Sequence, residues 1–214
     1  MFTLFSGFAN EELLDEILFL TVAAVETTST ALSWFIFYMS KYPHVQQKIK
    51  QELLANNITK RTYLTSETVD KLVYVDCVLK ELFRFAPNVD ITVRTVIEED
   101  EIENVKLNKG DTIFISFSNI HKDKRYWNID PNQFLPERFL NEDKNHSPYA
   151  LLPFGGGHRQ CPGQDFARLE LKIIISRLMQ FVTFTDGGEK TNKGGYKQRF
   201  TVTPQQMAVH ISFD

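Results

Sequence analysis

The sequence lacks the features of several common protein classes. Only two cysteines, Cys77 and Cys161, occur among its 214 residues, which argues against a disulfide framework and suits a reducing compartment. The net charge is −3 and no block of like charges occurs, so the charge pattern predicts no nucleic-acid partner. No phosphate-binding loop, dinucleotide fingerprint, internal repeat or low-complexity segment is present. With 43% hydrophobic and 24% charged residues, the composition is that of a globular chain.

A signal peptide is also lacking, because no basic segment precedes an apolar one after Met1. The longest apolar stretch, residues 17–39, is long enough to span a membrane as a helix. Glu26 and the hydroxyl cluster at 27–30 lie near its middle, and a carboxylate at the bilayer centre costs about 2.5 kcal/mol or more. We therefore expect a long helix through the core of a large protein, and neither a signal nor a transmembrane segment.

Hydrophobic periodicity and turn residues predict a mainly α-helical chain with small β-sheets. Pro43 ends one long helix and opens the next, and Pro87 follows another, because proline cannot continue a helix. The predicted helices are 10–41, a second from Pro43, 66–70, 74–85 and one after Cys161. The predicted strands are 92–96, 105–107 and 112–115, and a β-rich tail ends the chain. Residues 130–150, rich in Pro, Asn and Asp, are predicted to form an extended meander.

What the chain does contain is a glycine-rich segment with one cysteine, FGGGHRQCPG, from Phe154 to Gly163. Its glycines let the backbone pass close to a large flat cofactor and adopt positive φ where a turn requires it. Pro162 suits the first turn of a helix, whose positive dipole end would favour a thiolate at Cys161. The pattern predicts a metal-ligating cysteine. The simpler alternative is a glycine-rich loop that happens to hold a cysteine.

This loop resembles the haem-binding signature of the cytochrome P450 family, Phe-x-x-Gly-x-Arg-x-Cys-x-Gly. The resemblance implies haem b as cofactor, with the thiolate of Cys161 as the axial iron ligand. It implies that Phe154 packs on the cysteine side of the porphyrin and that Arg159 binds a propionate. The cofactor-binding residues of the loop are then Phe154, Gly155, Gly157, Arg159, Cys161 and Gly163.

Residues 23–28, AAVETT, resemble the family's oxygen-activation motif. The resemblance implies that Thr27 and Glu26 are catalytic, the hydroxyl and the acid of a proton relay. The family usually has glycine where this chain has Ala24, so a methyl group there would narrow the groove above the haem. The alternative is that these threonines are ordinary polar breaks in a core helix.

Two further motifs stand in the family's order. Glu81 and Arg84 resemble its Glu-x-x-Arg motif, and Arg138 in the meander would complete a buried ionic network with them. Arg94 occupies a strand position that in the family binds a haem propionate; the alternative is a solvated strand residue. His121 could also approach a propionate, but a lone histidine is more often a packed loop residue, and we leave it out of the site.

The resemblance implies that residues 1–214 are a single partial domain, the C-terminal half of a cytochrome P450 of the eukaryotic microsomal type. That half comprises the long central helix, the Glu-x-x-Arg helix, the meander, the cysteine loop and the following helix. The implied reaction is monooxygenation of a small apolar organic substrate, with electrons from NADPH through a flavin reductase. A basic group could face that reductase: Lys122, Lys124, Arg125, Arg168 and Lys172. The parent protein would lie at the cytosolic face of the endoplasmic reticulum, touching the membrane only through the missing N-terminal part.

Two alternatives remain open from the sequence. The chain could be a truncated, catalytically inert fragment that binds haem weakly or not at all, since half of the expected fold is missing. It could instead resemble the family members that rearrange or dehydrate peroxides without external electrons. The intact pair of Glu26 and Thr27 argues against this second alternative, because such enzymes have less need of a proton relay.

Overall fold

The computed structural model describes residues 9–214. Its helices are α1 (Asn10–Lys41), α2 (Pro43–Ala55), α3 (Ser66–Val69), α4 (Val73–Phe85), α5 (Phe117–His121) and α6 (Gln164–Phe181). Its strands are β1 (Ile91–Thr95), β2 (Asp100–Ile102), β3 (Val105–Leu107), β4 (Thr112–Ser116), β5 (Val182–Asp186), β6 (Tyr196–Gln198), β7 (Val202–Pro204) and β8 (Val209–Phe213). Three short 3-10 turns are η1 (Pro136–Phe139), η2 (Pro148–Ala150) and η3 (Gly157–Arg159). The predicted mainly helical fold with small sheets is confirmed.

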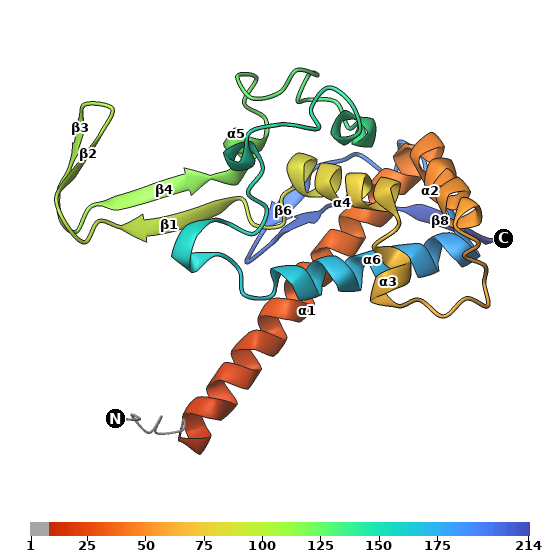
Figure 1. Ribbon diagram of the computed structural model, residues 1–214, viewed down its shortest axis with the longest axis horizontal. Helices are drawn as coiled ribbons and strands as arrows, with labels where there is room; N and C mark the ends of the chain where they lie inside the picture. Colours follow the sequence, from red (N-terminus) through yellow and green to blue (C-terminus); the bar gives the residue numbers. More distant parts are fainter. Residues whose placement is uncertain (1–8) are drawn as a thin grey trace.

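The strands of this part of the chain form four separate antiparallel pairs, β1–β4, β2–β3, β5–β8 and β6–β7. In the pair β1–β4, Arg94 lies opposite Ile113. Together with the β2–β3 hairpin, this pair extends to one side of the helices (Figure 1). The pair β5–β8 lies at the other side, near the C-terminal end of α6 (Figure 1).

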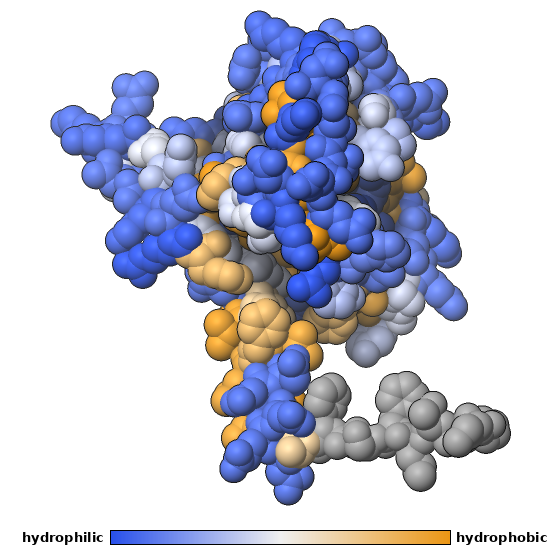
Figure 2. Space-filling view, turned by 90° about the vertical axis from the view of Figure 1, so that its left-hand side faces the viewer, coloured by the Kyte–Doolittle hydropathy of each residue, from blue (hydrophilic) through white to orange (hydrophobic). Residues whose placement is uncertain are grey.

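Helix α1 has two different halves. Its C-terminal half is in the main core, where Ala31, Phe35 and Met39 are fully buried. Its N-terminal half projects from the body of the molecule and carries exposed apolar side chains, such as Phe19 at 65% exposure (Figure 2). The expected long core helix is therefore correct only for the C-terminal half.

By length and composition α1 could cross a membrane, and only 17% of its most apolar window is buried. The prediction that this chain has no transmembrane segment stays a prediction. The related prediction of no signal sequence rests on residues 1–8, which lie outside the described part of the chain.

The main core joins the buried half of α1 to α2, α4 and α6, and β5 closes it at one end. Apolar residues at helical spacing supply this core, including Ile49 of α2, Leu82 of α4 and Ile175 of α6, each no more than 1% exposed. A second, smaller cluster lies beneath the meander and contains Cys77, Trp127, Phe139 and Ala150. The free thiol of Cys77 is thus a buried core group.

Candidate functional site

A cavity of about 380 Å³ lies between α1, α6 and the cysteine loop, within the size range of small-molecule sites. One wall is the α1 face that carries Ala23, Ala24 and Thr27, and the other contains Cys161 and Ala167. The predicted site residues that line it are Ala24, Thr27, Arg94, Phe154, Gly155, Arg159, Cys161 and Gly163. Predicted residues from three distant segments of the sequence are thus brought to one mainly apolar space.

The cysteine loop is shaped by its glycines. Gly155 and Gly157 have φ values of +75° and +71°, a conformation that residues with a side chain rarely adopt. The amide of Cys161 donates to the carbonyl of Phe154 at 2.9 Å, which closes the turn. A methyl group built on Gly163 would lie 3.9 Å from the sulfur of Cys161. The loop thereby presents an exposed free thiol to the cavity. Gly157 does not line the cavity, so its part in the site is to shape the backbone.

Thr27 lines the cavity from α1, and its hydroxyl donates to the carbonyl of Ala23 at 2.9 Å. This bond uses the hydroxyl proton within the helix and leaves oxygen lone pairs for a ligand. The amide of Asn88 donates to the carbonyl of Thr27 at 3.0 Å, so the helix turn that carries Thr27 is held from outside α1.

Glu26 is not among the residues that line the cavity. Its carboxylate accepts a hydrogen bond from the hydroxyl of Thr201 at 2.9 Å, and Thr201 is also paired with Thr30 at 2.9 Å. The acid and the hydroxyl of the predicted relay therefore point to different surroundings, because neighbouring helical residues lie about 100° apart around the axis. The relay stays a prediction.

The sequence reasoning missed an acid that does line the cavity, Glu170 of α6. Its carboxylate accepts a hydrogen bond from the hydroxyl of Thr28 at 3.2 Å, which ties the two walls of the cavity together. The contact joins residues 142 positions apart, so no local sequence pattern predicts it. Asn88 was missed for the same reason.

Arg94 and Arg159 both line the cavity, and their binding of haem propionates stays a prediction. The guanidinium of Arg94 donates to the hydroxyl of Thr92 and to the carbonyl of Val93, both at 2.8 Å. The guanidinium of Arg159 makes no hydrogen bond within residues 9–214. Both side chains keep donors for an anionic group, and guanidinium groups match carboxylates in a bidentate manner.

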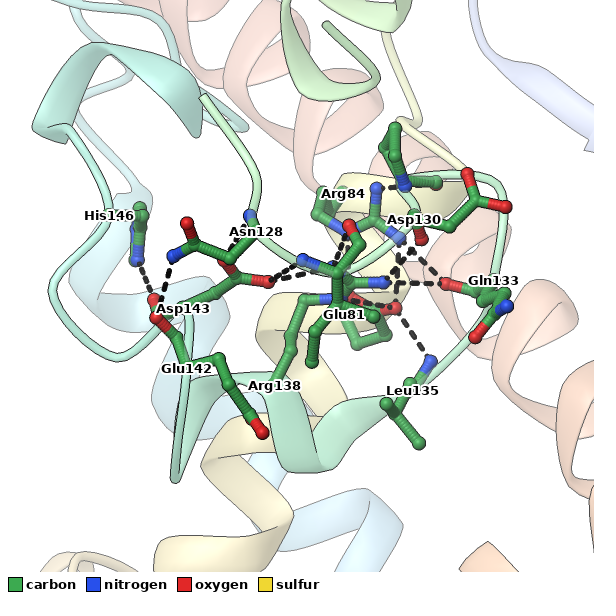
Figure 3. A network of polar contacts seen from close by, with 12 residues as sticks. Glu81, Arg84, Asn128, Asp130, Gln133, Leu135, Arg138, Glu142, Asp143 and His146 are labelled. Atoms are coloured by element: carbon green, nitrogen blue, oxygen red, sulfur yellow. Dashed lines mark hydrogen bonds and ion pairs between the residues drawn. The ribbon is translucent and has the colours of Figure 1, made fainter. Parts of the chain in front are cut away.

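A buried ionic network lies behind the site, beneath the meander (Figure 3). The carboxylate of Glu81 accepts from Arg84 Nε at 2.7 Å and Nη2 at 2.9 Å, and from Arg138 Nε at 3.1 Å. Arg138 also donates to Asp143 at 2.9 Å. All four side chains are at most 1% exposed. The predicted grouping of Glu81, Arg84 and Arg138 is what the structure contains, and Asp143 is an addition.

The remaining donors of this network are used by backbone carbonyls. Arg84 donates to His121 at 3.1 Å and to Pro131 at 2.8 Å, and both arginines donate to the carbonyl of Gln133. The indole ring of Trp127 lies 5.2 Å from the guanidinium carbon of Arg84 and 5.7 Å from that of Arg138. The network therefore fixes the path of the meander relative to α4.

The residues of the cavity fit a haem. Among residues 9–214 no group of three or more His, Cys, Asp and Glu could hold a metal ion by itself. An iron held by Cys161 would therefore need further ligands from a cofactor, which a porphyrin provides. The cavity offers this cofactor one thiol, apolar walls and two arginines for its acidic edge.

Comparison with known proteins agrees with this site. The family model "Cytochrome P450" matches residues 3–210. "Cytochrome P450 4V2" of Rattus norvegicus is 34% identical over 80% of this chain and 33% of its own length. "Putative cytochrome P450 120" of Synechocystis sp. is 36% identical over 81% of this chain and 39% of its own length. The solved structure "Retinoic acid bound cyanobacterial CYP120A1" has a TM-score of 0.87 and 31% identity, over 97% of this chain and 47% of that one.

The fold and the cavity are those of the haem-thiolate class of proteins, at the level of the family. The chain belongs to the cytochrome P450 family. It spans about a third of the length of the curated relatives it matches and about half of the solved structure. Its relatives include mammalian and cyanobacterial proteins, so the eukaryotic microsomal type stays a prediction.

Proposed function

We propose that this chain is the haem-binding part of a monooxygenase that inserts one atom of O2 into a small apolar organic substrate. The observation that carries the proposal is the cavity that Cys161, from the cysteine loop, and Thr27, from α1, line together. Bound haem would supply the redox-active iron at which oxygen is activated. The protein's own part is to hold that group, to keep water away and to position a hydroxyl.

Each residue of the cavity has a proposed task. Cys161 provides the iron ligand as a thiolate, and Phe154 shields its sulfur from water. Arg94 and Arg159 bind the propionates, whose carboxylates would otherwise lie uncompensated at the cavity edge. Gly155, Gly157 and Gly163 keep the loop thin enough for a porphyrin to lie against it, and Ala24 places only a methyl group on the opposite wall.

Thr27 is the proposed catalytic hydroxyl. Its proton is committed to Ala23, so the side chain acts first as an acceptor that orients a hydroxyl or a water in the cavity. Glu26 is the proposed proton source, and its bond to Thr201 means that a proton must pass through a hydroxyl or a water to reach the cavity. Glu170 orients the neighbouring Thr28.

The partners follow from the proposed reaction. Electrons would come from NADPH through a flavin reductase, and the substrate would be small and apolar because the cavity walls are apolar. The solved cyanobacterial CYP120A1 has retinoic acid bound, a molecule with a long apolar part. We place the parent protein at the endoplasmic reticulum membrane, on its cytosolic face, and treat residues 1–214 as a single partial domain of it.

The rival proposal is an inert fragment. Its basis is the projecting half of α1. The exposed apolar side chains of this half lie beside the cavity, so this side of the cavity is open to solvent. A chain of this kind would take up haem weakly or not at all.

One measurement separates these proposals. The chain is expressed with haem supplied, reduced and exposed to carbon monoxide, and its Soret band is recorded. We expect the strongly red-shifted band of thiolate ligation, which Cys161→Ser should abolish. Cys77→Ser is the matched control, because burial raises the pKa of the Cys77 thiol to about 11 and keeps it from acting as a ligand. Absence of haem uptake by the unchanged chain would refute the proposed function for residues 1–214.

A further inference from the structure

His121, the last residue of α5, is completely buried yet is not among the residues that line the cavity. Its ring stacks on Phe117 at a centroid distance of 6.1 Å, and Phe117 does line the cavity. Its Nε2 atom accepts a hydrogen bond from the backbone N–H of Leu152 at 2.9 Å. This buried histidine therefore accepts a hydrogen bond from a backbone amide 31 positions away, in addition to its packing contacts.

The direction of this hydrogen bond determines the state of the ring. Nε2 can accept only when it carries no proton, so the ring is neutral and its proton lies on Nδ1. Burial, with the nearby charge of Arg84, lowers the pKa of His121 to about 4. The ring is therefore neutral, and the bond to Leu152 is available, throughout the physiological pH range.

His121 also lies between two parts of the site. Its carbonyl accepts from Arg84 at 3.1 Å, which attaches its backbone to the buried ionic network. Leu152 begins the segment that leads to the cysteine: its carbonyl accepts from Gly155 at 3.1 Å, and Phe154 in turn accepts from the amide of Cys161 at 2.9 Å. One short chain of hydrogen bonds thus connects the network to the cysteine loop.

We propose that His121 is a positioning residue that holds the cysteine loop through the N–H of Leu152 and so keeps Cys161 in place as a thiolate ligand. The proposal rests on the proposed haem-binding function. Without the imidazole acceptor, the partly buried N–H of Leu152 loses its partner and the loop can open. An open loop no longer holds the sulfur of Cys161 at the cavity wall, so fewer chains would carry the thiolate as an iron ligand.

The first test needs no haem. Amide hydrogen exchange at Leu152 is measured in the haem-free chain for the unchanged protein, His121→Phe and His121→Gln. Phenylalanine keeps the ring but removes the acceptor, so Leu152 should exchange about tenfold faster or more. Glutamine places a side-chain oxygen at similar reach and should restore most of the protection.

Gln46→Leu is the matched control for this test. The side-chain oxygen of Gln46 is also a buried acceptor, for the amide of Phe184 at 2.8 Å, but it lies in another part of the fold. Its loss should speed exchange at Phe184 and leave Leu152 unchanged. If Leu152 exchanges at the same rate in His121→Phe as in the unchanged chain, the proposed clamp does not exist.

The second test asks whether the clamp matters for the ligand. Haem-loaded His121→Phe, reduced with carbon monoxide, should show a smaller fraction of the red-shifted thiolate band than the unchanged chain. His121→Gln and Gln46→Leu should keep that band. Faster exchange at Leu152 with an undiminished thiolate band in His121→Phe would overturn the proposal. If the unchanged chain takes up no haem, the proposed function fails, and the exchange measurement still decides whether the clamp exists.

Discussion

Replacement of Glu81 by glutamine is the sharpest test of the ionic network. The carboxylate of Glu81 accepts three guanidinium hydrogen bonds from Arg84 and Arg138 and a fourth, at 2.7 Å, from the amide of Leu135. With Asp143, the network contains two carboxylates and two guanidinium groups, so its charges cancel. Glutamine leaves one positive charge without a partner, at a site where the side chains are at most 1% exposed.

The expected cost is about 3–5 kcal/mol, the usual effect of removing one partner from a buried ion pair. Folded domains are stable by only about 5–15 kcal/mol, so Glu81→Gln should remove about a fifth or more of the total. Urea unfolding followed by circular dichroism measures the change in the free energy of unfolding. Because the network holds the meander against α4, the variant should also lose protection from proteolysis there.

The neighbouring residue provides the control. Lys80 pairs with Asp76 at 2.7 Å on the same helix, but the two side chains are 35% and 27% exposed. Lys80→Gln should therefore cost less than about 1 kcal/mol. If Glu81→Gln costs as little as Lys80→Gln, the argument that burial makes the network indispensable is wrong.

Three further predictions concern stability. The folded-state pKa of His121, about 4, lies below its usual value, so the neutral ring stabilises the fold above about pH 6.5. The free energy of unfolding should fall by about 3 kcal/mol as the pH falls from 6.5 towards 4. Urea midpoints measured over this range should change less with pH in His121→Phe than in the unchanged chain. Gly187→Ala should cost about 1–3 kcal/mol, because a methyl group there would lie 2.5 Å from the carbonyl oxygen of Ala208; calorimetry should show a lower Tm. Trp34→Phe removes the indole bond to the carbonyl of Val202, 2.6 Å long, and should cost about 1–3 kcal/mol in urea unfolding.

The elements of the fold could be predicted largely from local patterns. Pro43 opens α2 as expected, and α4 ends at Phe85, two residues before Pro87. Strands β1, β3 and β4 were predicted from runs of β-branched residues, whereas β2 was not. The pairing of the strands was not predicted either, because register depends on contacts between distant segments. The exposed half of α1 was not predicted either, since an apolar helix has the same sequence pattern whether or not its partners are present.

The residues of the site could likewise be predicted only in part. Cys161 and Thr27 could be placed because each lies in a short motif whose chemistry constrains the spacing of its residues. The orientation of Glu26 towards Thr201 depends on a contact 175 positions away, which no motif encodes. Glu170 was missed, and His121 was left out of the site, for the same reason: their partners are distant backbone or hydroxyl groups, and only the folded chain brings them together.

The positions of the two tryptophans give the protein two built-in optical probes. Trp34 is packed in the main core against Phe37 and Tyr38, whereas Trp127 lies over the paired guanidinium groups beneath the meander. Their fluorescence reports separately on these two regions, because each indole senses only its immediate surroundings. In a chain that keeps a single tryptophan, loss of the meander can be timed against loss of the core, which shows whether the two parts unfold together or in sequence.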